Sequence, residues 1–212
     1  MSSSPIGKYR DTNRYPSRGW NAYHVVYQDA QRWLKEGIHD ALFPMMYFQG
    51  NNFYPFALDW KENDGKRWII PGLGIYFLSP REQDWPLDEI VRQIHFTRQI
   101  KLNGQAYFRN RFLLDNTKGV LDELEENFYT YPALIPPMTW SDSIPPSVPS
   151  HPSVQQIANG KLRMSWQASA DNSNQSVVYH LYGSDTYPVD IKQPQNLIAT
   201  HLIANEYEYT AR

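Results

Sequence analysis

Aromatic and hydrogen-bonding side chains follow several apolar segments of the chain, where they could hold a ligand. The sequence contains 7 Trp and 15 Tyr among its 212 residues. Sugar rings present C–H faces that stack on Trp and Tyr, while amide and guanidinium groups bind hydroxyls. The candidate binding residues are Tyr47, Asn51, Asn52, Trp60, Tyr76, Arg109 and Asn110. The alternative interpretation is that these rings fill a core, and the sequence alone leaves both open.

Other chemistries find little support in the composition. The chain has no cysteine, which excludes disulfides, thiolate metal sites and a cysteine nucleophile. Its histidines are scattered without the i, i+4 spacing of a zinc motif, and Gly72-x-Gly74 lacks the third glycine of a dinucleotide fingerprint. The net charge of -2 argues against a nucleic-acid groove. We therefore expect no metal, no cofactor and no nucleic-acid partner, and the apolar runs are too short for a membrane span.

The elements that must position the candidate residues alternate between strand and helix. The apolar runs 41–48 and 68–78 lack the alternation of a half-exposed strand, as parallel strands buried on both faces do. Shorter strands are expected at 3–7 and 105–108. Helices are expected over 27–36, 56–61, 86–100 and 120–129. This order predicts an α/β fold with a parallel sheet, and the long loop 49–67 is where such folds place function.

A proline-rich stretch, residues 132–152, divides the chain. Proline fixes φ and lacks an N–H, so this stretch is expected to be extended. We place a boundary near Ser143, giving domains 1–142 and 143–212. Alternation over 161–167, with further strands at 177–183, 196–200 and 206–210, predicts a β-sandwich. A sandwich of this kind takes about 100 residues and seven strands, so the second domain is expected to be truncated.

Several short motifs occur in an order that is similar to one family. They are Ser3-Ser4-Pro5-Ile6-Gly7, Phe43-Pro44-Met45-Met46-Tyr47-Phe48, Pro71-Gly72-Leu73-Gly74-Ile75-Tyr76 and Pro132-Ala133-Leu134-Ile135-Pro136-Pro137-Met138-Thr139-Trp140. In these motifs the first part resembles the C-terminal half of glycosyl-hydrolase-like family 10 proteins, also called domain of unknown function 187. The second part looks like a fibronectin type III module, carried by Leu162-Arg163-Met164-Ser165-Trp166 and Val178-Tyr179-His180-Leu181-Tyr182. The resemblance implies a (β/α)₈ TIM barrel, represented by about its last four βα units, followed by an immunoglobulin-like sandwich.

The implied barrel would carry its catalytic carboxyl pair at the C-terminal ends of the strands. The residues at those ends include Gly7, Tyr47, Tyr76 and Arg109, and none is a carboxylate. Met45 also stands where the family often has Gln. Further acids follow in the loops: Asp59, Asp84, Asp88 and Asp115. Asp88 suits the positive end of a helix, where capping is the expected role. Asp59 is the candidate catalytic acid in this fragment, and the catalytic pair itself is expected either in the missing half or to be absent from this member.

The sequence thus predicts part of a glycoside hydrolase acting on complex carbohydrate, inactive as this fragment. The alternatives are a non-catalytic carbohydrate-binding or scaffold protein whose barrel has lost its chemistry, and an interaction module whose aromatic residues mark a protein interface. No signal peptide is recognised at the N-terminus, but the resemblance implies an extracellular, periplasmic or cell-surface location. The open edges of a half barrel predict self-association.

Overall fold

The computed structural model describes residues 1–173 and 175–210 and divides into two compact units, Met1–Phe128 and Tyr129–Arg212. The proline-rich stretch belongs to the second unit. The division therefore falls upstream of the boundary that the prolines suggested near Ser143. Each unit is described by itself below.

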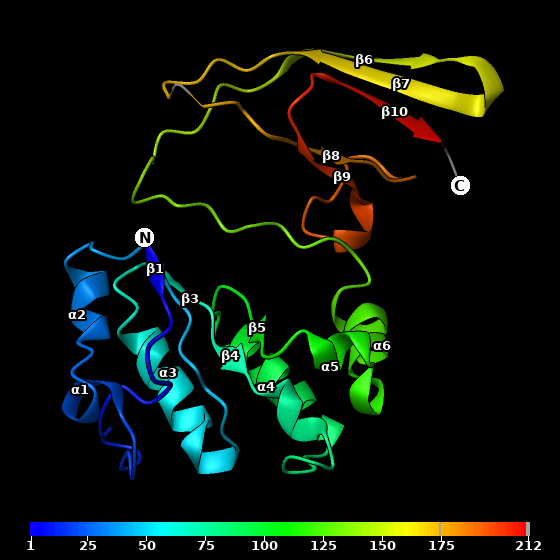
Figure 1. The fold of residues 1–212 in the computed structure, drawn as a ribbon. Helices are drawn as coiled ribbons and strands as arrows, with labels where there is room; N and C mark the ends of the chain where they lie inside the picture. The colour runs from blue at the N-terminus through cyan, green and yellow to red at the C-terminus, as the bar shows by residue number, and fades with distance from the viewer. Residues whose placement is uncertain (174, 211–212) are drawn as a thin grey trace. The chain divides into compact units, whose positions relative to one another are not determined.

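The first unit is built on parallel strands that lie side by side in sequence order (Figure 1). Strand β1 (Ser2–Ser3) pairs with β2 (Ala41–Leu42), which pairs with β3 (Trp68–Ile69). Strand β4 (Gly72–Leu73) pairs with β5 (Ala106–Tyr107). Parallel bridges from Ile6 to Met45 and from Met45 to Gly72 extend the pairing across all of these segments.

Prolines explain why these strands are short. Pro5, Pro44 and Pro71 each interrupt one of the first three parallel segments, and proline has no N–H to give to the ladder. Their carbonyls still accept: Met45 N donates to the oxygen of Pro5, and Gly72 N to that of Pro44. The expected continuous run 68–78 consequently consists of β3, β4 and a 3₁₀ helix, Ile75–Leu78.

Helices lie between the parallel segments and after the last of them. They are α1 (Ala22–Val25), α2 (Ala30–Lys35), α3 (Tyr54–Glu62), α4 (Leu87–Gln99), α5 (Arg111–Leu114) and α6 (Val120–Glu123), the last continuing as a π-helix, Leu124–Phe128. The helix expected over 86–100 forms as α4, and the one expected over 120–129 forms as α6 with its π-helical extension. The helix expected from residue 27 begins only at Ala30, because Tyr27 has a left-handed backbone (φ 56°).

The core of the first unit lies between the strands and helices α2, α3, α4 and α6. Fully buried strand residues include Leu42, Ile69 and Leu73, and the helices contribute Leu34, Phe56, Trp60, Ile90, Ile94 and Val120. Most of the buried apolar side chains that the structure describes belong to this unit. A well-packed core therefore supports the ends of the parallel strands.

The second unit consists of antiparallel strands in two small sheets. Strands β6 (Ser150–Gln156), β7 (Lys161–Gln167) and β10 (Glu206–Thr210) form one sheet in the order β10-β7-β6. Strands β8 (Tyr179–Tyr182) and β9 (Leu197–Leu202) form the other. Trp166 contacts Tyr179 with ring centroids 5.3 Å apart, and Leu197 is the buried apolar residue among those described in this unit. The strands expected around 161–167, 177–183, 196–200 and 206–210 all form.

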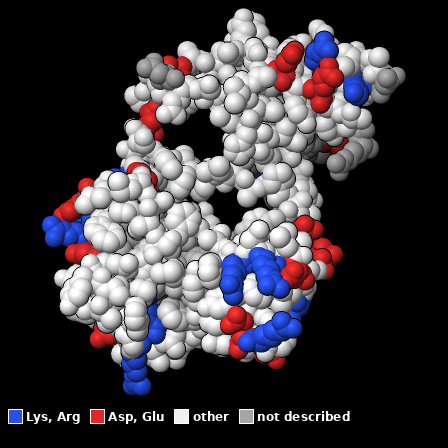
Figure 2. Space-filling view, in the orientation of Figure 1, with Lys and Arg blue, Asp and Glu red and all other residues white. Residues whose placement is uncertain are grey.

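Charged side chains of both signs are intermingled on the face shown in Figure 2. The full sequence contains 20 basic and 22 acidic residues, which agrees with this mixed surface. Within residues 1–173 and 175–210, no helix combines the length and apolar character needed to cross a bilayer.

Candidate functional site

Three aromatic rings meet at the C-terminal ends of the parallel segments, and we call Tyr47, Tyr76 and Phe108 the strand-end cluster. The rings of Tyr47 and Phe108 are stacked, with centroids 5.2 Å apart and planes at 17°. Tyr76 meets both edge-on, at 5.8 Å from Tyr47 and 5.7 Å from Phe108. Phe108 is 46% exposed. The structure thus brings together two of the predicted residues, Tyr47 and Tyr76, and adds Phe108, which the sequence analysis did not select.

Two glycines allow Tyr47 to lie across the neighbouring strand. A Cβ at Gly72 would lie 3.1 Å from Tyr47 Cε1, and a Cβ at Gly74 would lie 3.2 Å from Tyr47 Cβ. On the other side, a Cβ at Gly7 would come within 3 Å of the Met45 backbone. A Cβ at Gly7 would require the backbone to shift, and a Cβ at Gly72 or Gly74 would require Tyr47 to move by a few tenths of an ångström. The glycines of the Pro71–Tyr76 and Ser3–Gly7 motifs therefore set the packing of the cluster.

A charged pair borders the strand-end cluster. The guanidinium of Arg109 lies 6.0 Å from the Tyr76 ring centroid and 5.5 Å from that of Phe112, within cation–π range. Its Nη2 is 3.6 Å from Glu82 Oε1. Both residues line a hollow of about 380 Å³, together with Asp115. Glu82 was missed from the sequence, although its place in the loop after the 68–78 run was a usable signal.

The polar groups of the strand-end cluster suit binding of a neutral, hydroxyl-rich ligand. Burial raises the pKa of both Tyr47 and Tyr76, so their phenols stay protonated at neutral pH. The negative charge of Glu82 adds to the rise in the pKa of Tyr76, and Arg109 opposes it. Phenol, guanidinium and carboxylate groups together donate and accept hydrogen bonds next to exposed ring surface. Asn110 is exposed where α5 begins, directly after Arg109.

The acids in the hollow already have cationic partners. Glu82 faces Arg109, and Asp115 Oδ2 accepts a 3.2 Å hydrogen bond from Nε of Arg111. Glycoside hydrolysis needs one carboxyl group to give a proton and a second to attack or to activate water. Two carboxylates that are each paired with a guanidinium do not provide that difference in roles.

Trp60 lies in the core and presents no face to a ligand. Its exposed fraction is 0%, and its Nε1 donates a 2.7 Å hydrogen bond to the carbonyl of Gly7. Its ring contacts Tyr9 at 5.8 Å. The bond to Gly7 ties α3 to the end of the first parallel segment. Trp60 is therefore a core residue bonded to the end of a parallel segment, and it is not part of the strand-end cluster.

Asn51 and Asn52 belong to a 3₁₀ turn, Gly50–Asn52, that a buried lysine holds. Lys8 follows Gly7 at the end of the first parallel segment and is 5% exposed. Its Nζ donates a 2.7 Å hydrogen bond to Asn52 Oδ1 and lies 4.9 Å from the ring centroid of Phe48. Burial lowers the pKa of Lys8. Asn51 is exposed beside this anchored residue, and no contact places it in the strand-end cluster.

Asp59 lies on α3 and faces α2. Its Oδ2 accepts a 2.8 Å hydrogen bond from Nε2 of Gln31, and its Oδ1 lies 3.3 Å from Nδ2 of Asn63. Burial raises the pKa of Asp59, while the hydrogen bond from Gln31 and the charge of Arg10 oppose the rise. A raised pKa suits an acid catalyst, but the contacts of Asp59 are with helices and not with the strand-end cluster.

The described residues hold no group of three His, Asp or Glu side chains that could bind a metal ion. The histidine pair with adjacent rings, His180 and His201, lies in the second unit with ring centroids 5.7 Å apart. Two imidazoles alone do not complete a tetrahedral site.

Comparison with known proteins gives one distant relative. The chain is 28% identical, over 219 aligned residues, to a Bacillus subtilis (strain 168) protein named glycosyl hydrolase YngK. The alignment covers 97% of this chain, so both units take part in it, but only 42% of the relative. The chain thus spans less than half the length of that protein. No family model matches the chain. These findings establish a distant, glycosyl-hydrolase-like relationship.

Proposed function

We propose that this chain is part of a carbohydrate-active protein of glycosyl-hydrolase-like family 10 (domain of unknown function 187). The first unit would supply about the last four βα units of a (β/α)₈ barrel, and the second a partial fibronectin type III-like module. Two observations support this proposal. The parallel segments lie side by side in sequence order, as successive barrel strands do. The relative named as a glycosyl hydrolase aligns with nearly the whole chain.

In this proposal the strand-end cluster forms part of a sugar-binding surface. The observation that carries it is the stacked pair of Tyr47 and Phe108, with Tyr76 edge-on, at the ends of the parallel strands. That is the edge at which (β/α)₈ enzymes bind substrate. An exposed ring offers stacking to the C–H face of a sugar, and Arg109 and Glu82 provide charged partners for its hydroxyls.

We propose that the chain by itself binds carbohydrate without hydrolysing it. The acids beside the strand-end cluster are paired with arginines, and Asp59 faces α2. In an active full-length protein the catalytic carboxyl groups would come from the part of the barrel outside this chain. In a full-length protein without such groups, the barrel would serve as a binding or scaffold domain. For both cases we propose an extracellular, periplasmic or cell-surface location, as the resemblance implies.

The test is calorimetric titration of the whole chain with cellohexaose, xylohexaose and chitohexaose, repeated with Phe108→Ala. We expect at least one of these neutral oligosaccharides to bind and the substitution to weaken that binding about tenfold, the upper range for one aromatic contact. Tyr187→Ala is the matched control, since Tyr187 is 96% exposed and lies in the second unit. Binding by no oligosaccharide, or equal loss in both variants, would overturn the proposal. Release of nitrophenol from aryl-glycosides would refute the inactivity of the chain.

Self-association is proposed from the sheet edges. Among the described residues, β1 pairs with β2 alone and β5 with β4 alone, which leaves one edge open on each side. Sedimentation velocity over a concentration series should show a dimer or larger species. A single monomeric species at the highest concentration would contradict this expectation.

A further inference from the structure

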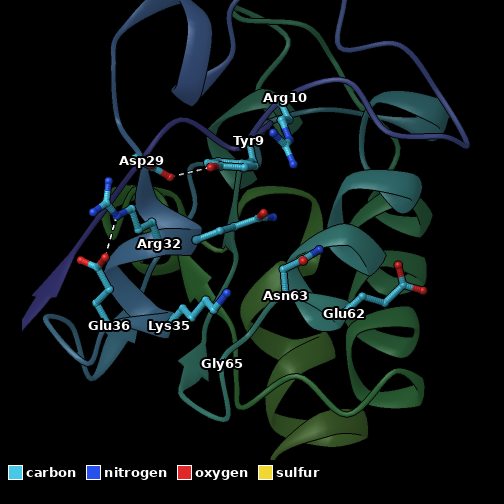
Figure 3. Close-up of a pocket in the computed structure, with 10 residues that line it drawn as sticks. Tyr9, Arg10, Asp29, Arg32, Lys35, Glu36, Glu62, Asn63 and Gly65 are labelled. Atoms are coloured by element: carbon cyan, nitrogen blue, oxygen red, sulfur yellow. Dashed lines mark hydrogen bonds and ion pairs between the residues drawn. The ribbon is translucent and has the colours of Figure 1, made fainter.

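A second hollow, of about 670 Å³, is lined by residues of α2 and α3 (Figure 3) and by none of the strand-end cluster. Arg10, Asp29, Gln31, Lys35 and Asn63 are among its lining residues. A smaller hollow of about 370 Å³ is lined by Tyr23, His24, Tyr27 and the same Asp29. The two hollows adjoin at Asp29, and the guanidinium of Arg10, in the first, lies over the ring of Tyr23, in the second. We call the two together the α2–α3 groove.

The acidic side chains of the α2–α3 groove already have hydrogen-bond donors. Asp29 Oδ1 accepts a 2.6 Å hydrogen bond from the Tyr9 hydroxyl. The other two acids are in ion pairs, Glu36 with Arg32 at 2.7 Å and Glu62 with Arg14 at 2.6 Å. The amide groups are also held, since the nitrogens of Gln31 and Asn63 both point to Asp59. Asp59 thus holds the side chains of Gln31 and Asn63 in place.

Two cationic side chains of the α2–α3 groove have hydrogen-bond donors that no other side chain uses. Within residues 1–173 and 175–210, the side-chain nitrogens of Arg10 and Lys35 form no hydrogen bond and no ion pair, and Figure 3 shows both side chains reaching toward the hollow. The guanidinium of Arg10 lies on the faces of two tyrosines, 5.4 Å from the ring centroid of Tyr9 and 5.7 Å from that of Tyr23. The groove therefore has unused cationic donors and few unused anionic acceptors, so a ligand should supply the negative charge.

The other end of the α2–α3 groove is aromatic. Tyr27 is 87% exposed and Tyr23 is 36% exposed. Tyr27 also has a φ of 56°, a left-handed conformation that costs a bulky residue roughly 1–2 kcal/mol. A strained backbone that presents an aromatic ring to water is unfavourable for folding alone, and such positions concentrate at binding sites.

We propose that the α2–α3 groove is a second carbohydrate site that binds an oligosaccharide bearing carboxylate groups. A sugar ring stacks on Tyr27, and the carboxylates of the chain reach Arg10 and Lys35. The choice of a saccharide rests on the proposed function, whereas the choice of an acidic one rests on the two uncommitted cations. This site lies on the outer helices, so it would hold a polysaccharide without taking part in any reaction at the strand ends.

The experiment is calorimetric titration of the whole chain with hexagalacturonate. We expect binding that weakens as salt is added, because the attraction between exposed charges is screened. Arg10→Gln, Lys35→Gln and Tyr27→Ala should each weaken it by about tenfold, the loss expected for one charge-assisted bond or one stacking contact. The matched controls are Lys101→Gln, an exposed lysine after α4, and Tyr187→Ala in the second unit. Far-UV circular dichroism confirms that each variant stays folded.

Any of four results would overturn the inference. One is the absence of hexagalacturonate binding. Another is equal binding of neutral maltohexaose, or full competition by sulfate at equal charge, which would show that a carboxylated sugar is not recognised. The last is loss of hexagalacturonate binding in Phe108→Ala but not in Arg10→Gln, which would place the acidic sugar at the strand-end cluster. That last outcome would leave the proposed function intact, so the two proposals fail separately.

Discussion

Trp60 and the strand-end cluster place aromatic rings at the same end of the parallel strands, in opposite environments. Trp60 is completely buried, and its N–H is bonded to the Gly7 carbonyl. In the strand-end cluster the rings contact one another, and Phe108 is 46% exposed. An aromatic ring near a strand end can therefore meet a ligand only where water reaches it. Where the backbone satisfies its polar group, the ring belongs to the core.

The largest expected effect is that of Trp60→Ala. Removing a fully buried indole leaves a cavity and an unpaired Gly7 carbonyl, so the free energy of unfolding should fall by about 3–5 kcal/mol. Urea unfolding followed by far-UV circular dichroism measures it, since α1–α6 all belong to the first unit. Trp60→Phe keeps most of the ring and should cost less. A loss below about 1 kcal/mol for Trp60→Ala would contradict its role as a core residue.

Gly72→Ala should have the next largest effect. It should lower both the stability of the core and the affinity of the strand-end cluster. The added methyl would lie 3.1 Å from Tyr47 Cε1 and 3.3 Å from the Pro44 carbonyl oxygen. The ring of Tyr47 must shift, which should cost about 1–3 kcal/mol of stability. Because Tyr47 stacks on Phe108, oligosaccharide affinity should fall as well. Unfolding and titration of the same variant measure both. Unchanged affinity would show that Tyr47 does not shape the ligand surface.

Much of the scaffold could be predicted from the sequence, because local rules govern it. The apolar runs gave the positions of the parallel segments, and the i, i+3, i+4 pattern after Pro86 gave α4. Pro44 and Pro71 indicate where the ladder of the parallel strands loses a donor. They do not indicate that the strands stop pairing, because the proline carbonyls still accept hydrogen bonds. The start of α2 was misplaced because no local rule predicts a left-handed Tyr27.

The side chains of the site were harder to predict, because tertiary contacts decide their roles. Trp60 was taken as a ligand residue, yet a signal for burial was present: Phe53, Phe56, Ala57 and Trp60 follow a helical stripe, and all are fully buried. Phe108 could not be singled out, because its significance lies in its contact with Tyr47 from another segment. For Glu82 the place in the loop after the 68–78 run was a signal, but its pairing with Arg109 is a tertiary contact that this signal does not predict.

Phe108→Ala should separate binding from stability. Its ring is half exposed, so the loss of stability should be about 1 kcal/mol, the value of an aromatic pair at a partly exposed site. Sugar affinity should nevertheless fall as predicted above. The same unfolding assay used for Trp60→Ala gives the stability. If Phe108→Ala destabilised the first unit as much as Trp60→Ala does, the strand-end cluster would be core, and the distinction between the two regions would fail.

The smallest effect should come from Asp59→Asn. Asp59 precedes Trp60 in the chain, but its side chain faces α2. Burial raises the pKa of Asp59 above its usual 3.8, so the folded chain binds this proton more tightly than the unfolded chain does. Stability contributed by that proton is present in acid and is lost as the pH rises through the raised pKa. Asn carries no charge, so the stability of Asp59→Asn relative to the natural chain should increase between about pH 4 and about pH 7. Urea midpoints of both chains over this pH range measure their difference in stability. If that difference is the same at every pH, burial on α3 does not raise the pKa of Asp59.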